Sequence, residues 1–431
     1  MSGGSLASSL SDPARPSFLF GSSPPREGTS EEDARAACEK FVSRSRALAC
    51  DGFIVYDLQD EAGRTTEARP FPFRKTLDPS WYGSLFRPLC GKETVIYKCV
   101  AGMRPDEFDG WLDTAITRHG HTAFNLVGAA SSSTDLSASV SLPEAARAVC
   151  ARANRDADRV GFGCVTIAER HKKKGNEHEN ILRKTRMGAE WFISQGVFDA
   201  DATVKMLLDY ADLCRSKMVT PKKVVLTFAP CGRRKTMTFI KWLGMDVPAA
   251  VEERIFSKNL VLPDGRDHGP VYESCDIACE ILTDVLLKTA ACGVPLGVNV
   301  ESLSIFREEI DAAHLLFQRL QTLILNARGS PWAVRWFDVT RVGQPSSMAT
   351  SESVANVYAL ERLSHQRRSL EREREGFKTS ATLAIAGAAS DVTIAIPGVV
   401  SLSVNPYAAM AIAAGVAGSV GLAYGRAMGG R

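Results

Sequence analysis

Eight short apolar segments recur along the first 300 residues, and a stretch with helical periodicity follows each of them. This alternation constrains the fold more than any other feature of the sequence. The segments are Ser17–Phe20, Gly52–Asp57, Thr94–Cys99, Thr122–Val127, Val160–Thr166, Glu190–Ser194, Lys223–Phe228 and Leu296–Val300. Most are almost continuously hydrophobic, which is typical of parallel strands buried on both faces. The chain is therefore predicted to be an α/β protein.

The intervening stretches carry the signals of amphipathic helices. In the first of them, Ser30 is a favourable N-cap, and Glu31 and Asp33 place negative charge in the first turn. The predicted helices are Ser30–Ala49, Asp106–Arg118, Pro143–Asp156, Asn176–Met187, Asp199–Lys217, Arg233–Leu243, Pro248–Ser257, Tyr272–Ala291 and Ser304–Asn326. Strands and helices in this order predict a closed (β/α)8 barrel of the TIM type over residues 17–330.

An open, doubly wound sheet is the alternative architecture. It usually has fewer strands and often carries a glycine-rich phosphate-binding loop after the first strand. Here the first segment is followed by Gly21-Ser22-Ser23-Pro24-Pro25, and the chain has no Walker motif and no G-x-G-x-x-G sequence. The barrel is therefore the favoured prediction.

Three segments lie outside the predicted barrel. Residues 1–16 are rich in Ser, Ala and Pro and lack the apolar core of a signal peptide, so we expect a disordered leader. Residues 331–378 are predicted to form a linker and a long charged helix. Residues 379–431 are an Ala/Gly-rich apolar tail, in which Tyr407–Gly425 has 19 uncharged residues, near the length that spans a bilayer. Membrane association and a homo-oligomer contact both remain open for this tail.

Charge and cysteine content limit the partners and the compartment. With 52 basic and 49 acidic residues, the net charge of +3 does not favour nucleic-acid binding by bulk electrostatics. The 11 cysteines are irregularly spaced, which does not predict a disulfide framework and fits a reducing, cytoplasmic location. His119 and His121 supply at most half of a metal site, so no metal is expected.

Candidate functional residues follow the ends of the predicted strands, because barrel enzymes carry their sites at that face. Asp57 ends the second strand, Gln195 follows the sixth, and Asn299 and Glu301 end the eighth. A basic stretch, Glu169–Lys174, follows the fifth strand and leads into the helix that contains Glu177. It is either a cradle for phosphate or carboxylate, or a solvated surface loop.

Residues 163–255 resemble methylenetetrahydrofolate reductases, which are flavin-dependent (β/α)8 barrels. The family's Tyr-Pro-Glu-x-His-Pro motif corresponds to Ile167-Ala168-Glu169-Arg170-His171-Lys172. Its Asp-x-x-Asn-x-x-Arg-Lys helix corresponds to residues 177–184, and its Ile-Thr-Gln strand end to Ile193-Ser194-Gln195. The resemblance implies FAD as cofactor, NAD(P)H as electron donor and a folate as substrate. It assigns FAD binding to Glu169, His171, Glu177, Asn180, Arg183 and Lys184, and places Gln195 at the folate or nicotinamide.

The N-terminal half departs from the family pattern. The catalytic Glu of the family's Ser-Phe-Glu-Phe motif is Leu19 here, and the strand-four Asp is Ala129. The predicted function is a divergent methylenetetrahydrofolate reductase-like oxidoreductase of folate and methionine metabolism, with Asp57, Gln195 and Glu301 as candidate catalytic residues. The alternatives are a non-catalytic barrel with a ligand-binding or regulatory role, and an unrelated barrel activity.

Overall fold

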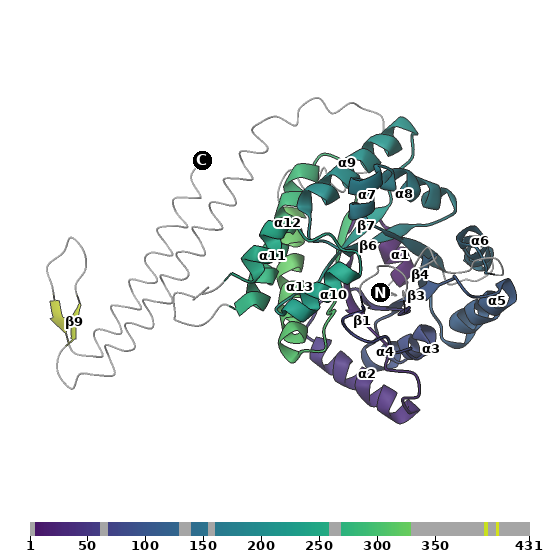
Figure 1. Cartoon of the computed structure of the whole chain (residues 1–431), viewed down its shortest axis with the longest axis horizontal. Helices are drawn as coiled ribbons and strands as arrows, with labels where there is room; N and C mark the ends of the chain where they lie inside the picture. Colours follow the sequence, from purple (N-terminus) through teal and green to yellow (C-terminus); the bar gives the residue numbers. More distant parts are fainter. Residues whose placement is uncertain are drawn as a thin grey trace. The chain divides into compact units, whose positions relative to one another are not determined.

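Eight parallel strands close into a barrel in the computed structural model, which describes residues 5–60, 68–128, 139–153, 160–257, 269–328, 392–394 and 402–404 (Figure 1). The strands are β1 (Phe18–Ser22), β2 (Gly52–Val55), β3 (Thr94–Cys99), β4 (Ala123–Val127), β5 (Gly161–Thr166), β6 (Trp191–Gly196), β7 (Lys223–Phe228) and β8 (Leu296–Val300). They pair in chain order, and β1 pairs with β8 to complete the ring. The predicted (β/α)8 barrel is confirmed.

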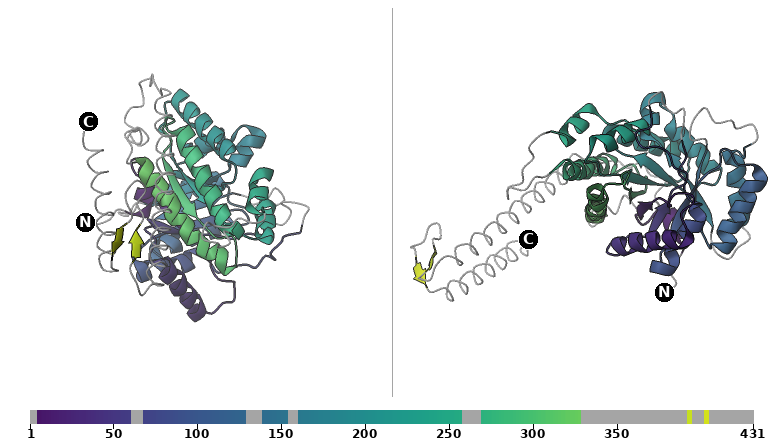
Figure 2. Two further views of the ribbon diagram at one scale, coloured as in Figure 1. Left: turned by 90° about the vertical axis from the view of Figure 1, so that its left-hand side faces the viewer. Right: turned by 60° about the horizontal axis from the view of Figure 1, so that its bottom comes forward.

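Helices surround this barrel (Figures 1 and 2). The predicted ones are present as α2 (Glu31–Ser45), α5 (Pro105–Asp113) continued by the π-helical turn Thr114–Arg118, α6 (Leu142–Ala153), α8 (Glu177–Arg186), α9 (Ala200–Ser216), α10 (Arg234–Trp242), α11 (Ala249–Ile255), α12 (Gly269–Thr289) and α13 (Arg307–Arg328). Four short helices were not predicted: α1 (Leu6–Ser11), α3 (Pro79–Ser84), α4 (Phe86–Cys90) and α7 (Ala168–Lys174). All four are too short for a helical periodicity to show in the sequence.

The strand register stacks the inward side chains in layers, each contributed by alternate strands. From the C-terminal mouth downward, three successive layers are Gly21, Tyr97, Val165 and Thr227; then Ile54, Asn125, Ile193 and Asn299; then Leu19, Val95, Gly163 and Val225. The lowest of these layers is apolar, whereas the upper two include polar residues. Among these three layers, the polar inward side chains therefore lie in the two nearest the mouth.

A short N-terminal helix, α1 (Leu6–Ser11), packs against the lower end of the barrel, at the centre of the ring in Figure 1. Leu6 and Leu10 are buried in one cluster with Leu19 and Trp191. The Leu6 amide also donates to the Glu93 carboxylate (2.9 Å). The prediction of a disordered leader is therefore wrong from residue 5 onward. That prediction rested on composition, and two leucines among serines do not indicate that the end of a barrel will bury them.

The C-terminal region belongs to a second unit, residues 349–431, separate from the barrel unit. Within it, β9 (Val392–Ile394) and β10 (Leu402–Val404) pair in antiparallel fashion. The expected charged helix at 351–377 and most of the Ala/Gly-rich tail lie outside the described residues. In the part of the chain that the structure describes, no helix is both long enough and apolar enough to cross a membrane.

We predict that α1 contributes to the stability of the barrel. Leu10 is fully buried, so Leu10→Ala should lower the free energy of unfolding by about 2–5 kcal/mol through lost burial and a cavity. Ser8→Ala, on the same helix, should change it by less than about 1 kcal/mol. Urea unfolding monitored by tryptophan fluorescence checks both; equal values for wild type and Leu10→Ala would show that α1 does not stabilise the barrel.

Candidate functional site

A chain of hydrogen bonds crosses the mouth of the barrel between β8 and β2. Asn299 Nδ2 donates to the Tyr56 hydroxyl (3.0 Å) and lies 3.3 Å from Thr227 Oγ1. Tyr56 is in turn hydrogen-bonded to the Glu301 carboxyl group. Because the Tyr56 oxygen already accepts from Asn299, its proton points toward Glu301. These hydrogen bonds hold the Glu301 carboxyl group at the C-terminal face of the barrel, where the functional sites of such barrels are found.

Burial raises the pKa of Glu301 to about 7, and the hydrogen bond from Tyr56 opposes this shift. Burial also raises the Tyr56 and Tyr97 pKa values well above the usual range, with further contributions from Glu301. The two tyrosine rings lie 4.8 Å apart, nearly edge to face. Near neutral pH, Glu301 can therefore either carry a proton or accept one, beside two neutral phenols.

Buried polar atoms without a partner lie below this chain. Asn125 is fully buried, and within the described part of the chain neither its Nδ2 nor its Oδ1 has a hydrogen-bond partner. Asn299 Oδ1 and Trp191 Nε1 also lack one. Since β4 and β8 are opposite in an eight-stranded ring, Asn125 and Asn299 face each other across the same layer. The barrel interior thus offers donors and acceptors that no described residue uses.

The expected catalytic candidate Asp57 belongs to the wall of the barrel mouth. Its Oδ2 accepts from the Cys99 amide (2.9 Å) and lies 3.8 Å from Lys98 Nζ. Burial raises the Asp57 pKa, although Lys98 opposes that shift. These contacts tie the end of β2 to β3, which favours a structural role for Asp57.

Gln195 lies at the C-terminal end of β6, as expected. A β-bulge interrupts the β6–β7 register there, between Ile193 and Gly196. Bulges of this kind re-aim a side chain. Gln195 Nε2 donates to the Leu243 carbonyl after α10 (2.7 Å), so the amide oxygen is the group it can offer a ligand.

Residues 165–184, within the segment that resembles the family, form hydrogen bonds with one another. Glu177 is fully buried, and its carboxylate accepts from the Ile167 amide (3.2 Å), from Arg170 (3.1 Å) and from Asn180 Nδ2 (3.2 Å). Lys184 Nζ donates to the Val165 carbonyl (2.6 Å), and burial lowers its pKa. These bonds fix the connection between β5 and α8. They favour a structural role for Glu177, Asn180 and Lys184 over the cofactor contacts that the resemblance implies.

Glu169 and His171 are also buried. Burial raises the pKa of Glu169 to about 7, with smaller contributions from Asp199 and Asp246. His171 Nε2 is 2.8 Å from Asp209 Oδ2 on α9, in the outer layer of helices. Only Arg183 among the expected cofactor residues is exposed.

These residues do not fit FAD in the way the resemblance implies. A pyrophosphate needs several free cationic or amide donors, and Lys184 is committed to a carbonyl inside the protein. Asp57 is engaged with β3, and Leu19 occupies the position of the family's acid. Ala129 lies outside the described residues. The expectation of FAD therefore gains no support from the described side chains.

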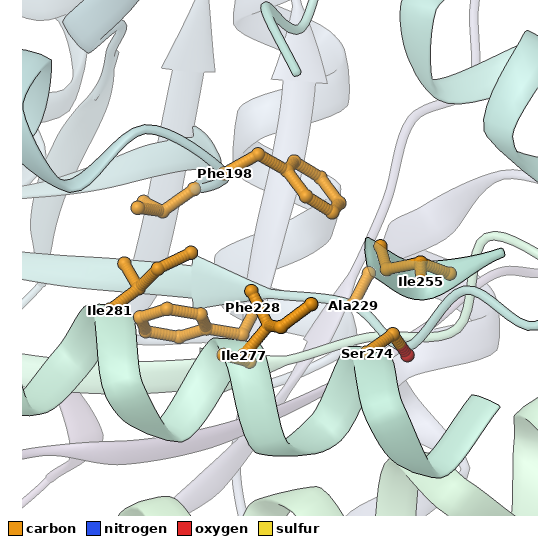
Figure 3. Close-up of a pocket in the computed structure, with 9 residues that line it drawn as sticks. Phe198, Phe228, Ala229, Ile255, Ser274, Ile277 and Ile281 are labelled. Atoms are coloured by element: carbon orange, nitrogen blue, oxygen red, sulfur yellow. The ribbon is translucent and has the colours of Figure 1, made fainter. Parts of the chain in front are cut away.

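A separate, small hollow lies between the ends of β6 and β7 and the helices α11 and α12 (Figure 3). Its lining is almost wholly apolar and includes Phe198, Phe228 and Ile277. The hydroxyl of Ser274 already donates to the Val271 carbonyl (2.6 Å) and accepts from the Cys231 amide (2.9 Å). A hollow without a free polar group cannot orient a polar ligand. We therefore place the candidate site at the barrel mouth.

Comparison with known proteins gives a relative with a stated ligand. No protein-family model matches the chain, and no curated protein matches it significantly. An uncharacterized protein from Clostridium thermocellum that binds two copies of 5-methyl-5,6,7,8-tetrahydrofolic acid has 27% sequence identity and a TM-score of 0.59. The match covers 74% of this chain and 100% of that chain. The chain is thus similar in sequence and fold to a folate-binding barrel.

Two further solved structures match at lower similarity. A 2,3-dimethylmalate lyase has 11% identity and a TM-score of 0.36, over 85% of this chain and 97% of that chain. An oxaloacetate acetylhydrolase has 10% identity and a TM-score of 0.35, over 85% and 98%.

Sequence reasoning placed Asn299 and Glu301 at the end of the eighth strand but missed their neighbours Tyr56, Tyr97 and Asn125. A signal for Asn125 was present, because a lone amide inside the apolar strand segment Thr122–Val127 has few reasons to be buried. The sequence did not show that Asn125 faces Asn299, because this arrangement depends on the register of all the strands in the ring. Tyr56 gave no signal, because an aromatic residue at a strand end is ordinary core composition.

We predict a pH dependence of stability from Glu301. Its folded-state pKa of about 7 exceeds the ordinary 4.5, so its contribution is complete below about pH 4.5 and is lost as pH rises toward 7. Between pH 5 and 8, the wild-type unfolding free energy should fall by on the order of 2 kcal/mol more than that of Glu301→Gln. Parallel pH profiles from urea unfolding would contradict the assignment.

Restoring the family's acid at residue 19 should fail in this chain. Leu19 is fully buried in the apolar layer above α1, so Leu19→Glu places an uncompensated carboxyl group there. We expect a loss of at least about 3 kcal/mol in the free energy of unfolding. Leu19→Met should lose less than about 1.5 kcal/mol. A Leu19→Glu protein as stable as Leu19→Met would mean that residue 19 reaches the polar mouth.

Proposed function

We propose that the mouth of the barrel binds a reduced folate. The observation that carries this proposal is the similarity to the Clostridium thermocellum barrel, a binder of 5-methyltetrahydrofolate whose whole length is matched. The resemblance of residues 163–200 to a folate-using reductase family supports the same ligand class. Fold similarity alone would not suffice, since barrels host many unrelated chemistries.

The side chains at the mouth suit the chemistry of a pterin ring. Such a ring is flat, with an edge of amide and amino groups that both donate and accept hydrogen bonds. Tyr56 and Tyr97 provide aromatic surface, and Glu301 provides a carboxyl group that titrates near neutrality. The Asn299 and Asn125 amides have unused atoms in the layer beneath. The ring is proposed to enter the mouth and bond to this set.

Glu301 is the residue we propose to touch the reacting part of the ligand. In its neutral form it donates a hydrogen bond to a ring nitrogen, and in its ionised form it accepts one from a ring N–H. Its pKa near 7 makes both forms accessible, which is the property a general acid needs. Glu301, at the end of β8, would then serve as the acid that the family carries at the position of Leu19 on β1.

Reduction of methylenetetrahydrofolate is the finer function that the resemblance implies, with FAD and NAD(P)H as its redox groups. The flavin contacts it requires do not fit the described side chains, so we propose folate binding as the function and no flavin-dependent step. A non-catalytic role in sensing or carrying folate needs only the binding site. Measuring NAD(P)H oxidation in the presence of the folate distinguishes a reductase from a non-catalytic binder, because only a reductase carries out this oxidation.

We predict that the full chain binds 5-methyltetrahydrofolate and that Asn299 contributes to the affinity. Asn299→Leu removes the donor that orients Tyr56, so the dissociation constant should rise about tenfold. Glu93→Gln is the control, because Glu93 lies at the opposite end of the barrel and bonds to α1. It should change the dissociation constant by less than about twofold. Isothermal titration calorimetry gives both values.

Two measurements complete this test. Flavin release from the purified chain and NAD(P)H oxidation with methylenetetrahydrofolate measure the reductase function directly. Absence of 5-methyltetrahydrofolate binding at about 1 mM ligand would refute the proposed function. Tight FAD binding with folate-dependent NAD(P)H oxidation would show that the family's activity persists despite Leu19.

A further inference from the structure

Two histidines and an aspartate meet where three outer helices pack together. His171 lies on α7, His178 is in the first turn of α8, and Asp209 is in the middle of α9. Gly175 ends α7 in the left-handed region (φ +67°), which lets α8 start almost at once in a new direction. The turn brings the imidazole of His178 against that of His171, with ring centroids 5.0 Å apart and planes at 87°.

The three side chains present suitable ligand atoms to one another. One imidazole nitrogen of each histidine and one carboxylate oxygen of Asp209 all lie within 4.8 Å of each other. His171 is almost fully buried, at 2% exposure, whereas His178 and Asp209 are half-buried. The Nδ1 atoms of both histidines are buried and have no hydrogen-bond partner among the residues that the structure describes. Buried imidazole nitrogens without a partner are uncommon, and a bound ligand is one reason for them.

We propose that His171, His178 and Asp209 hold a divalent transition-metal ion, with Zn²⁺ as the best fit. Imidazole and carboxylate ligands suit zinc, whereas calcium and magnesium prefer oxygen ligands alone. Three protein ligands with two of them half-buried leave a fourth position that water can reach. The proposal rests on this cluster alone and is independent of folate binding at the mouth.

The other histidine pair lacks these properties. His119 and His121 have ring centroids 6.2 Å apart. His121 Nε2 is hydrogen-bonded to the Ser80 carbonyl (2.7 Å), and its Nδ1 lies 3.4 Å from Thr94 Oγ1. Both nitrogens of His121 are therefore engaged inside the protein. This pair serves as the internal comparison, and the sequence-based expectation of no metal there stands as a prediction.

Lys205 gives the proposed site a distinctive signature. Its ammonium group is 2.7 Å from Asp209 Oδ2, the same oxygen that pairs with His171. A metal ion and this ammonium compete for the charge of one carboxylate. Removing the lysine charge should therefore strengthen metal binding, an effect that a merely structural His–Asp–Lys network would not produce.

The experiment uses the full chain, treated with a chelator and then titrated with Zn²⁺ by calorimetry and with Co²⁺ by visible absorption. Wild type should bind one equivalent of Zn²⁺, and Co²⁺ should give the absorption bands of a site with nitrogen ligands. His178→Ala should weaken Zn²⁺ binding at least about tenfold. Lys205→Met should tighten it about two- to fivefold. His119→Ala is the matched control and should leave the affinity unchanged.

Thermal unfolding separates ion binding from loss of fold. Zn²⁺ should raise the melting temperature of wild type and of His119→Ala but not that of His178→Ala, because an ion that binds only the folded state stabilises it. Folate affinity measured on the same variants should not change. No bound equivalent in wild type, an unchanged Zn²⁺ affinity in His178→Ala, or weaker binding in Lys205→Met would overturn the proposal.

Discussion

The parallel pairing of β1 with β8 is the constraint on which the rest of the structure depends. It closes the ring, with Leu19 beside Asn299 and Phe20 beside Val300. Once the ring is closed, every inward side chain is assigned to a layer, because alternation along each strand leaves no freedom. A shift of one residue in this pairing would turn Asn299 and Glu301 outward and bring Val298 and Val300 inward. The polar mouth therefore exists only in this register.

Closure also explains why the two ends of the barrel differ. At the lower end, an added Cβ on Gly52 would lie 2.7 Å from the Leu6 side chain, so the glycine makes room for α1. At the mouth, an added Cβ on Gly21 would lie 2.9 Å from both Glu301 and Tyr56. One glycine thus admits an apolar plug, and the other admits the polar pair that we place at the ligand. A glycine at each end of the barrel thus leaves space for a different feature, α1 at the lower end and the Glu301–Tyr56 pair at the mouth.

The sequence predicted the barrel well, because strands buried on both faces leave continuous apolar runs that survive divergence. Lys223–Phe228 and Leu296–Val300 agree with the structure to the residue. The site was harder to predict. A shared motif does not tell whether Glu177 and Lys184 touch a cofactor or fix the loop, and in this chain both bond inward to β5 and its following turn. Glu301 was found because strand ends are visible in sequence, whereas Asn125 needed the register of all eight strands.

The polar interior has an energetic consequence that favours a ligand. Each buried donor or acceptor without a partner costs about 1–3 kcal/mol, and Asn125 alone contributes two such atoms. Apolar residues of similar size would fill the same layer, as Ile54 and Ile193 do on the other two strands. A barrel that keeps amides there loses stability, and this loss is offset only when water or a ligand bonds to them. One further layer, with Gly21, Tyr97, Val165 and Thr227, lies between these amides and the mouth, and Asn299 reaches past it through its hydrogen bond to Tyr56. The buried amides that lower the stability of the barrel are therefore the same groups that would help to recognise the ligand at the proposed folate site.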